Sequence, residues 1–314
     1  MKLCIIFNPH SGRNRRRPGL GDDIRSFISA RSLDAELLVT EGPGHATQLA
    51  RAAVAAGASV VVAVGGDGTM NEVAQGLVGG PAALGLVPCG SGNGLARHLE
   101  VARTPLAALQ LATGGDGRIV AIDTGLANGR PFFNAMGLGF DAEVSAAFNQ
   151  SKHRGLAAYA RVGVGALRKF RSEQCRITSG ASRTDLEVLL IAVANSDQYG
   201  NNARIAPGAR ADDGLLDLVA IRPLGWLGAS LLVPRLFFGN ISHSRSVFRL
   251  TKARFTIERA ASGLIHTDGE THATTALIEV SVRPRSLRVL VPAGSMMATN
   301  VPPLAPPAFA LQFK

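Results

Sequence analysis

Lysine, cysteine and aromatic residues are scarce in this sequence, and each scarcity excludes a class of protein. Only five lysines occur, and none follows a glycine or an Ala-Ile pair, so the phosphate-binding Gly-Lys-Ser/Thr loop and the protein-kinase lysine motif are both absent. The three cysteines form no Cys-X-X-Cys pair, which argues against a disulfide framework or a zinc site. Aromatic residues make up 5%, too few for stacking platforms that bind single-stranded nucleic acid.

Long apolar runs are also lacking. The first one ends at Asn8 and Pro9, too early for a secretory signal, and no later run reaches the ~18 residues of a membrane span. We therefore expect a soluble cytoplasmic protein.

The sequence is nevertheless long and apolar enough for two domains, with 314 residues of which 46% are hydrophobic. Its net charge of +10 comes from 33 Lys and Arg against 23 Asp and Glu. Such an excess suits a polyanionic partner, which could be a nucleotide, an anionic membrane or nucleic acid.

Residues 1–123 alternate short apolar runs with alanine-rich stretches, the pattern of a mostly parallel α/β sheet. The expected strands are residues 3–8, 35–40, 60–64, 83–88 and 119–123. The expected helices are residues 45–56, 71–77 and 105–113.

Residues 124–291 have a different sequence pattern, in which strand-like segments follow one another with few helices between them. This pattern predicts a mainly antiparallel β-sandwich domain. The expected strands are residues 126–133 around an Asn-Gly turn, 187–195, 215–222, 248–257 and 278–291. Helical insertions are expected at residues 141–150, 155–170 and 224–238.

Three glycine-rich turns follow strand-like runs of the first domain: NPHSG (residues 8–12), GGDGTMNE (65–72) and PCGSGNGLAR (88–97). Glycines let the backbone approach a phosphate, and helix N-termini present unpaired N–H groups to it. Open α/β sheets bind ligands beyond the carboxyl ends of their strands, so three such turns indicate a nucleotide-binding cleft.

Asp67 does not fit simple anion binding, because a carboxylate beside a phosphate needs a cation or a reacting hydroxyl between them. We therefore interpret Asp67 as catalytic or as acting through Mg²⁺. The alternative is a glycine turn with a capping aspartate.

Together with ADDGLLDL (residues 211–218) and HTDGE (266–270), these motifs resemble the diacylglycerol kinase catalytic-domain superfamily, which includes bacterial lipid kinases, sphingosine kinases and ceramide kinases. They follow the family's order over nearly the whole chain. The resemblance implies ATP-dependent phosphorylation of a lipid hydroxyl in a cleft between a nucleotide domain and a β-sandwich domain. It also implies that the tail, about residues 292–314, returns to the first domain.

The expected ATP contacts come from the three turns and from the ends of two further strands. They are Asn8, Ser11, Thr40, Gly65, Gly66, Asp67, Gly68, Thr69, Met70, Asn71, Glu72, Gly90, Ser91, Asn93 and Asp123. The resemblance implies Asn8, Ser11, Thr40, residues 66–72 and Ser91, and the glycine turns themselves add Gly65, Gly90 and Asn93. Asp123 is expected to join Asp67 and Asn93 in a network through metal and water.

A structural Mg²⁺ is implied at the fourth motif, where bacterial lipid kinases of this family use one aspartate and two carbonyls. These correspond to Asp213 and the carbonyls of Arg210 and Leu215. The residues agree in part, because Asp212, Asp213 and Asp217 bring hard oxygen ligands together. The alternative is an Asp-Gly hairpin leading into a strand.

The turn Asp268-Gly269-Glu270 is expected to present two carboxylates. The resemblance implies that Glu270 is the proton acceptor, which would orient the lipid hydroxyl and take its proton during phosphoryl transfer. Without the other motifs, an ordinary surface turn would be the better interpretation.

The acceptor lipid is less well defined, because residues 93–96 read Asn-Gly-Leu-Ala where bacterial diacylglycerol kinases commonly have Asn-Asp-Phe-Ala. Diacylglycerol or a related glycerolipid is our first expectation, and a sphingoid base or ceramide is the alternative. An NAD kinase is a rival because that related fold shares the Gly-Gly-Asp-Gly turn. A non-catalytic basic module that binds membrane or nucleic acid is a rival of another class. The motifs favour a lipid kinase that uses ATP and Mg²⁺ and does not bind nucleic acid.

Two segments bear on a membrane surface. The arginines at positions 13 and 15–17 form either a solvated loop or a contact with anionic lipid. Residues 224–239 form an apolar helix that is either part of the core or a docking face or acyl pocket. We expect an enzyme that is peripheral to the membrane, and a homodimer is left open.

Overall fold

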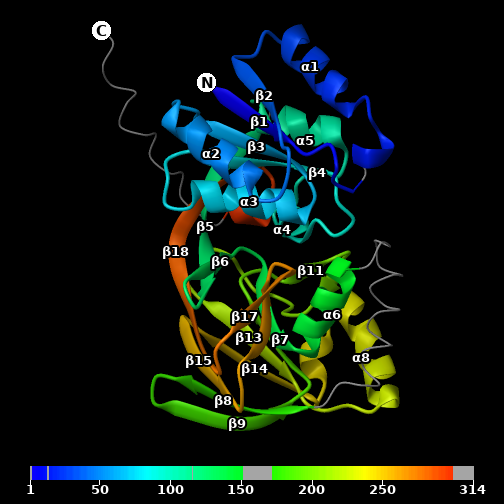
Figure 1. Cartoon of the computed structure of the whole chain (residues 1–314), viewed down its shortest axis with the longest axis vertical. Helices are drawn as coiled ribbons and strands as arrows, with labels where there is room; N and C mark the ends of the chain where they lie inside the picture. The colour runs from blue at the N-terminus through cyan, green and yellow to red at the C-terminus, as the bar shows by residue number, and fades with distance from the viewer. Residues whose placement is uncertain (1, 13, 115, 151–171, 300–314) are drawn as a thin grey trace. The chain divides into compact units, whose positions relative to one another are not determined.

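The computed structural model describes residues 2–12, 14–114, 116–150 and 172–299, which belong to two compact units (Figure 1). Unit 1 contains the chain up to Ile122 and the chain from Arg285 onward, and unit 2 contains Asp123–Pro284. The chain passes from one unit to the other within β5 (Gly117–Ala127) and β18 (Leu277–Pro292). The helix expected at residues 155–170 and the tail from residue 300 lie outside the described residues.

Unit 1 contains a parallel sheet in the strand order β2-β1-β3-β4-β18. The first four strands are β1 (Leu3–Phe7), β2 (Ala35–Val39), β3 (Val60–Gly65) and β4 (Ala83–Pro88). β1, β3 and β4 are buried along their whole length, which explains why their sequences are continuous apolar runs without alternation. The parallel α/β domain expected from the sequence is confirmed.

Helices connect these strands. They are α1 (Leu20–Ala30), α2 (His45–Ala55), α3 (Asp67–Leu77), α4 (Gly94–His98) and α5 (Pro105–Ala112), with a short 3₁₀ turn η1 (Asn14–Arg16) and a C-terminal α9 (Met296–Thr299). The helix α1, which buries Leu20, Ile24 and Phe27 along one side, was not predicted from the sequence. The helix predicted to start at Asn71 is α3, which already starts at Asp67.

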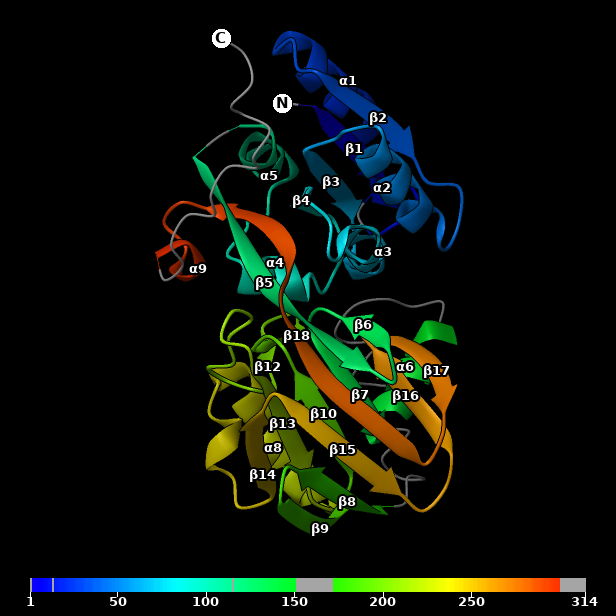
Figure 2. The ribbon, with the colours of Figure 1, turned by 90° about the vertical axis from the view of Figure 1, so that its left-hand side faces the viewer.

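Unit 2 is a β-sandwich, as expected (Figure 2). One sheet has the order β14-β13-β10-β7-β16-β17, and the facing strands have the order β18-β15-β8-β9, all antiparallel. Their apolar inner faces form one core, to which Met136, Ile191, Phe255 and Ile257 contribute. The β5–β6 hairpin turns at Asn128 and Gly129, both in the left-handed region, as the Asn-Gly signal predicted.

The strands of unit 2 after β5 are β6 (Arg130–Phe132), β7 (Ala135–Gly139), β8 (Glu173–Ser179), β9 (Ser182–Val188), β10 (Leu190–Ala194), β11 (Gln198–Gly200), β12 (Ala203–Arg204), β13 (Leu216–Ile221), β14 (Val247–Lys252), β15 (Arg254–Arg259), β16 (Gly263–Thr267) and β17 (Glu270–Thr274). The single strand expected at residues 248–257 is therefore two strands, which break at Ala253 and belong to different sheets.

Unit 2 also contains two helices and a 3₁₀ turn, which are α6 (Phe140–Gln150), α8 (Trp226–Phe238) and η2 (Ile241–His243). A second apolar cluster forms where Leu232 of α8 meets Ala192 of β10 and Val219 of β13. Among the helices of the described residues, none combines the length and the apolar character needed to span a bilayer.

Candidate active site

The three glycine turns of unit 1 meet in direct backbone contact. Gly12 has a φ of +36°, and a Cβ there would lie 2.5 Å from the carbonyl oxygen of Cys89. A Cβ at Gly90 would lie 2.8 Å from the Cα of Gly66. Only glycine permits these approaches, so the turns that follow β1, β3 and β4 pack as one backbone cradle.

Asp67 joins the second turn to the third. Its Oδ2 accepts a hydrogen bond from the Asn93 N–H at 2.8 Å, and its Oδ1 accepts one from the Gly94 N–H at 2.8 Å. Asp67 is also the first residue of α3, where a carboxylate interacts favourably with the helix dipole. The aspartate therefore fixes the third turn at the start of α4, which corresponds to the capping role that the sequence offered as the alternative for Asp67.

Asn93 closes the third turn on itself. It has a φ of +51°, a conformation that asparagine tolerates better than most residues. Its Oδ1 accepts the Gly90 N–H at 2.9 Å, and its Nδ2 donates to the Gly90 carbonyl at 2.8 Å. Ser91, at the exposed tip, is held clear of these bonds and faces solvent.

The first turn is tied to α3 by Asn8. The Nδ2 of Asn8 donates to the Thr69 hydroxyl oxygen at 2.9 Å, and the Ser11 hydroxyl donates to the Asn8 carbonyl at 3.2 Å. Asn14 donates to the same carbonyl at 2.7 Å. A surface hollow of about 310 Å³ lies beside this turn, lined by Phe7, Pro9, His10, Asn14, Arg15 and Pro18.

Other residues expected at the nucleotide have structural contacts of their own. Met70 is buried in the core, and Thr40 is buried where β2 ends, with its N–H donating to the Phe7 carbonyl at 2.9 Å. The Oε2 of Glu72 accepts the Ala46 N–H at 3.1 Å at the start of α2. A Cβ at Gly65 would clash with the Thr69 side chain at 2.5 Å. Gly68 and Asn71 lie in the first two turns of α3.

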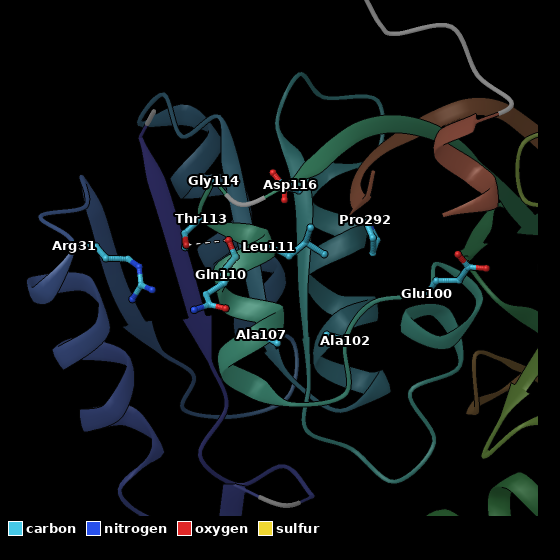
Figure 3. Close-up of a pocket in the computed structure, with 10 residues that line it drawn as sticks. All are labelled: Arg31, Glu100, Ala102, Ala107, Gln110, Leu111, Thr113, Gly114, Asp116 and Pro292. Atoms are coloured by element: carbon cyan, nitrogen blue, oxygen red, sulfur yellow. Dashed lines mark hydrogen bonds between the residues drawn. The ribbon is translucent and has the colours of Figure 1, made fainter. Parts of the chain in front are cut away.

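A larger hollow of unit 1, of about 600 Å³, is unrelated to the glycine turns (Figure 3). It is lined by Arg31, Glu100, Ala102, Ala107, Gln110, Leu111, Thr113, Gly114, Asp116 and Pro292. Arg31 precedes β2 and Asp116 precedes β5, whereas Pro292 is the last residue of β18, so the hollow is not confined to one end of the strands. None of the expected nucleotide contacts lines it.

In unit 2, Asp268 and Gly269 form the two-residue loop of the β16–β17 hairpin, both with positive φ. The Asp268 carboxylate accepts three backbone hydrogen bonds, from Phe133 at 2.8 Å, Asn134 at 2.8 Å and Ala135 at 3.0 Å. Burial raises the pKa of Asp268 to about 6, although these N–H groups lower it. The expectation of two presented carboxylates is therefore wrong: Asp268 fastens the turn, and Glu270 alone is exposed.

His266 contacts the same turn through a hydrogen bond. Its Nε2 lies 2.8 Å from Oδ2 of Asp141, and the Gly269 N–H donates to its Nδ1 at 3.2 Å. The Tyr199 hydroxyl donates to the same Asp141 oxygen at 2.7 Å. The Asp141 charge raises the pKa of His266 against the opposing effect of burial.

Gly137 of β7 makes room for this buried pair, because a Cβ there would lie 2.3 Å from Oδ2 of Asp141 and 2.5 Å from Nε2 of His266. Sequence reasoning did not identify Asp141 as a site residue, since it is 125 positions from His266. The available signals were the acidic residue at the start of a helical pattern and the histidine within HTDGE.

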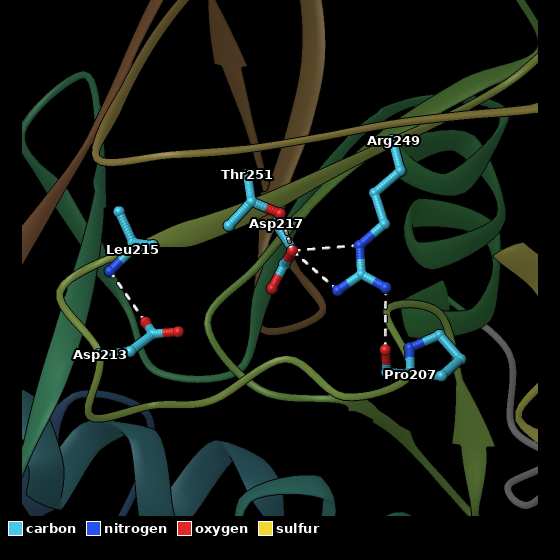
Figure 4. A network of polar contacts seen from close by, with 6 residues as sticks. All are labelled: Pro207, Asp213, Leu215, Asp217, Arg249 and Thr251. Atoms are coloured by element: carbon cyan, nitrogen blue, oxygen red, sulfur yellow. Dashed lines mark hydrogen bonds and ion pairs between the residues drawn. The ribbon is translucent and has the colours of Figure 1, made fainter.

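The three aspartates of the fourth motif have different partners, and Figure 4 shows those of Asp213 and Asp217. Asp212 forms an ion pair with Arg210 at 3.0 Å, and Asp217 forms one with Arg249 at 2.8 Å. Asp213 accepts the Leu215 N–H at 3.0 Å. Among the described residues, no three side chains of the metal-binding types converge. The three aspartates therefore do not form a shared carboxylate cage.

Asp213 still suits a hard cation in combination with backbone carbonyls. Burial raises its pKa, and the charges of Asp217, Asp123 and Asp212 raise it further, so a bound divalent cation would relieve this repulsion. Asp123 is fully buried, and its Oδ2 accepts the Gly214 N–H at 2.7 Å, which places it beside the same turn. The donor set of Asp213 and the carbonyls of Arg210 and Leu215 fits Mg²⁺ in chemical type.

Comparison with known proteins identifies the family to which the chain belongs. The diacylglycerol kinase catalytic domain matches residues 2–127, and the YegS C-terminal NAD kinase beta sandwich-like domain matches residues 134–291. The chain is 34% identical to a protein of Pseudomonas aeruginosa (strain UCBPP-PA14) named "Probable lipid kinase YegS-like", over 90% of this chain and 93% of the relative. A protein of the same name from Pseudomonas fluorescens is 32% identical, over 89% and 94%.

A crystal structure from Bacillus anthracis str. Sterne, described as a diacylglycerol kinase, has the same fold. The TM-score is 0.68 at 19% identity, covering 92% of this chain and 96% of that one. The fold and the matched domains define an ATP-dependent kinase. The chain belongs to the YegS-like lipid kinases, which carry the diacylglycerol kinase catalytic domain.

Proposed function

We propose that this lipid kinase transfers the γ-phosphoryl group of ATP to the hydroxyl of diacylglycerol or a related glycerolipid at a membrane surface. Unit 1 would bind ATP, and unit 2 would receive the lipid. The observation that carries the proposal is the contact among the three glycine turns, with Asp67 holding the third turn through two N–H groups at 2.8 Å.

Such a cradle suits phosphates because glycines let the backbone approach an anion closely and because a helix start, such as that of α3, favours negative charge. Asn8, Ser11 and Ser91 would add side-chain donors, and the buried Thr69 would hold Asn8 in place. The family implies ATP use, and Mg²⁺ is part of our proposal, with Asp213 and neighbouring carbonyls as its holders. When bound, Mg²⁺ would neutralise negative charge close to the reacting groups.

Glu270 is our candidate for the proton acceptor. As the lipid oxygen forms its bond to the γ-phosphorus, the bond to the bridging oxygen of ADP breaks and the hydroxyl proton passes to the Glu270 carboxylate. Glu270 is exposed at the start of β17, whereas Asp268, His266 and Asp141 beneath it are engaged in hydrogen bonds. We assign these three to positioning the turn, because a base must be held within hydrogen-bond reach of its substrate.

The test is a radiolabelled-ATP assay of the full chain against a panel of diacylglycerol, a sphingoid base and ceramide in mixed micelles, with NAD as a soluble acceptor. The proposal predicts labelled product from diacylglycerol, and loss of most transfer in Asp67→Asn. Exposed Asp34 provides the matched control, because Asp34→Asn changes the same charge in unit 1.

Each other result contradicts a definite part of the proposal. Label in ceramide or the sphingoid base alone would reject the glycerolipid acceptor but keep the lipid kinase. Label in NAD alone would reject the lipid acceptor. No ATP consumption with any acceptor would reject catalysis and leave a binding module.

A further inference from the structure

The helix α8 carries a broad apolar face that solvent reaches. Trp226 is 73% exposed, Leu231 is 72% exposed and Phe238 is 80% exposed, and Leu227 and Val233 are also exposed. Soluble proteins rarely expose so many large apolar side chains on one element unless the surface binds something.

Helical geometry separates this face from the buried side of α8. At about 100° per residue, Leu232 points away from the exposed set, and it packs with Leu236 against the apolar cluster over β10 and β13. The exposed residues of this side are Trp226, Leu227, Ser230, Leu231, Val233, Pro234 and Phe238. Ser230 is their only polar member, so the surface face of α8 is as apolar as its core face.

The flanking sequence is exclusively basic. No acidic residue occurs between Asp217 and Glu258. Over the same stretch the basic residues are Arg222, Arg235, His243, Arg245, Arg249, Lys252 and Arg254. Arg249 pairs with Asp217, and Arg222 and Arg245 are exposed before and after α8. The sequence on both sides of α8 is therefore positively charged.

We propose that α8 is an interfacial helix that docks the kinase on an anionic bilayer, with its apolar face among the acyl chains and the flanking arginines at the headgroups. A large apolar face bordered by arginines is the composition that favours this position. A second copy of the chain fits less well, because a two-fold contact would place equal basic flanks opposite each other. The inference concerns docking and does not depend on which lipid is phosphorylated.

The chain offers a direct probe, because Trp226 is its only tryptophan and lies on the proposed face. The full chain is titrated with vesicles of phosphatidylglycerol and phosphatidylcholine, and in parallel with vesicles of phosphatidylcholine alone. Docking predicts that Trp226 emission shifts to the blue with the anionic vesicles and is quenched by brominated acyl chains. High salt should weaken binding, because it screens the arginines.

Two pairs of variants separate the apolar and the charged contributions. Leu227→Ser with Leu231→Ser is expected to weaken vesicle partitioning about tenfold or more, through lost apolar burial. Arg222→Gln with Arg245→Gln is expected to weaken binding to anionic vesicles about fivefold per arginine. The matched control is Leu106→Ser with Leu277→Ser, which alters two exposed leucines outside α8 and should leave partitioning unchanged.

Glu270→Gln is expected to bind vesicles like the wild type, so loss of kinase activity and loss of docking are distinguishable. Unchanged Trp226 emission with anionic vesicles, or equal partitioning of the Leu227/Leu231 variant and the control, would overturn the proposal. A blue shift that rises with protein concentration in vesicle-free buffer, together with a doubled mass, would assign the face to a second copy instead.

Discussion

Asp268→Asn tests whether the Asp268 carboxylate fastens the β16–β17 turn. The wild-type carboxylate accepts N–H groups from Phe133 at 2.8 Å, Asn134 at 2.8 Å and Ala135 at 3.0 Å. An asparagine oxygen can keep the two bonds that share Oδ1, but its NH₂ group then faces the Phe133 N–H, and two donors cannot pair. Asparagine tolerates the positive φ of this position, so backbone strain contributes little.

The expected cost follows from those bonds. One charge-assisted hydrogen bond is lost and one buried N–H is left unsatisfied, which together cost about 2–4 kcal/mol in the free energy of unfolding, and this cost is partly offset because asparagine has no charge to bury. Urea unfolding at pH 8, above the Asp268 pKa of about 6, measures this difference. Asp185→Asn, at an exposed position of β9, is the control and should lower the midpoint by no more than the small contribution of its surface ion pair with Arg176. Equal midpoints for the two variants would refute the fastening role of Asp268.

Three further substitutions test other contacts. Gly137→Ala should lower the thermal midpoint and the transfer rate, because its Cβ would lie 2.3 Å from the Asp141 carboxylate; wild-type values would contradict the packing. Asp141→Asn should lower the pKa of His266 in an NMR titration, since the Asp141 charge raises it; an unchanged titration would reject that coupling. Because the pKa of His266 is higher in the folded protein than its ordinary value of 6.5, protonated His266 stabilises the fold at pH values below 6.5. This stabilisation is lost as the pH rises through the pKa of the folded protein. The Asp141→Asn variant should not show that loss. Gly12→Ala should raise the Kd for ATP in calorimetry, because its Cβ would lie 2.5 Å from the Cys89 carbonyl oxygen. An unaltered Kd would show that this turn does not contribute to ATP binding.

The parallel strands and the glycine turns could be predicted from the sequence because their signals are local. A buried parallel strand is a continuous apolar run, and a turn that must approach another backbone carries glycine within a few residues. The Asn128-Gly129 hairpin was likewise predicted from two adjacent residues. By contrast, α1 was not predicted, although it has the same length as α2 and buries Leu20, Ile24 and Phe27 on one side.

The contacts that could not be predicted join distant parts of the chain. Asp268 accepts bonds from residues about 135 positions earlier, so nothing beside it shows that its carboxylate turns inward. Asp67 was singled out from the sequence because a carboxylate is unusual in a glycine turn, but its two bonds to the third turn depend on how the sheet places α3 and α4. Similarly, the sequence does not show that Asp212 and Asp217 form ion pairs with arginines. Of the three carboxylates that are close in sequence, only that of Asp213 is left as a candidate metal ligand.

The most direct test of the proposed chemistry is single-turnover phosphoryl transfer by Glu270→Gln, measured together with its Kd for ATP. We predict transfer slowed by about 10²-fold or more with an ATP affinity equal to that of the wild type, because only the proton acceptor is removed. Glu279→Gln, an exposed change in the same unit, should transfer at the wild-type rate. Transfer by Glu270→Gln at the wild-type rate would contradict the account.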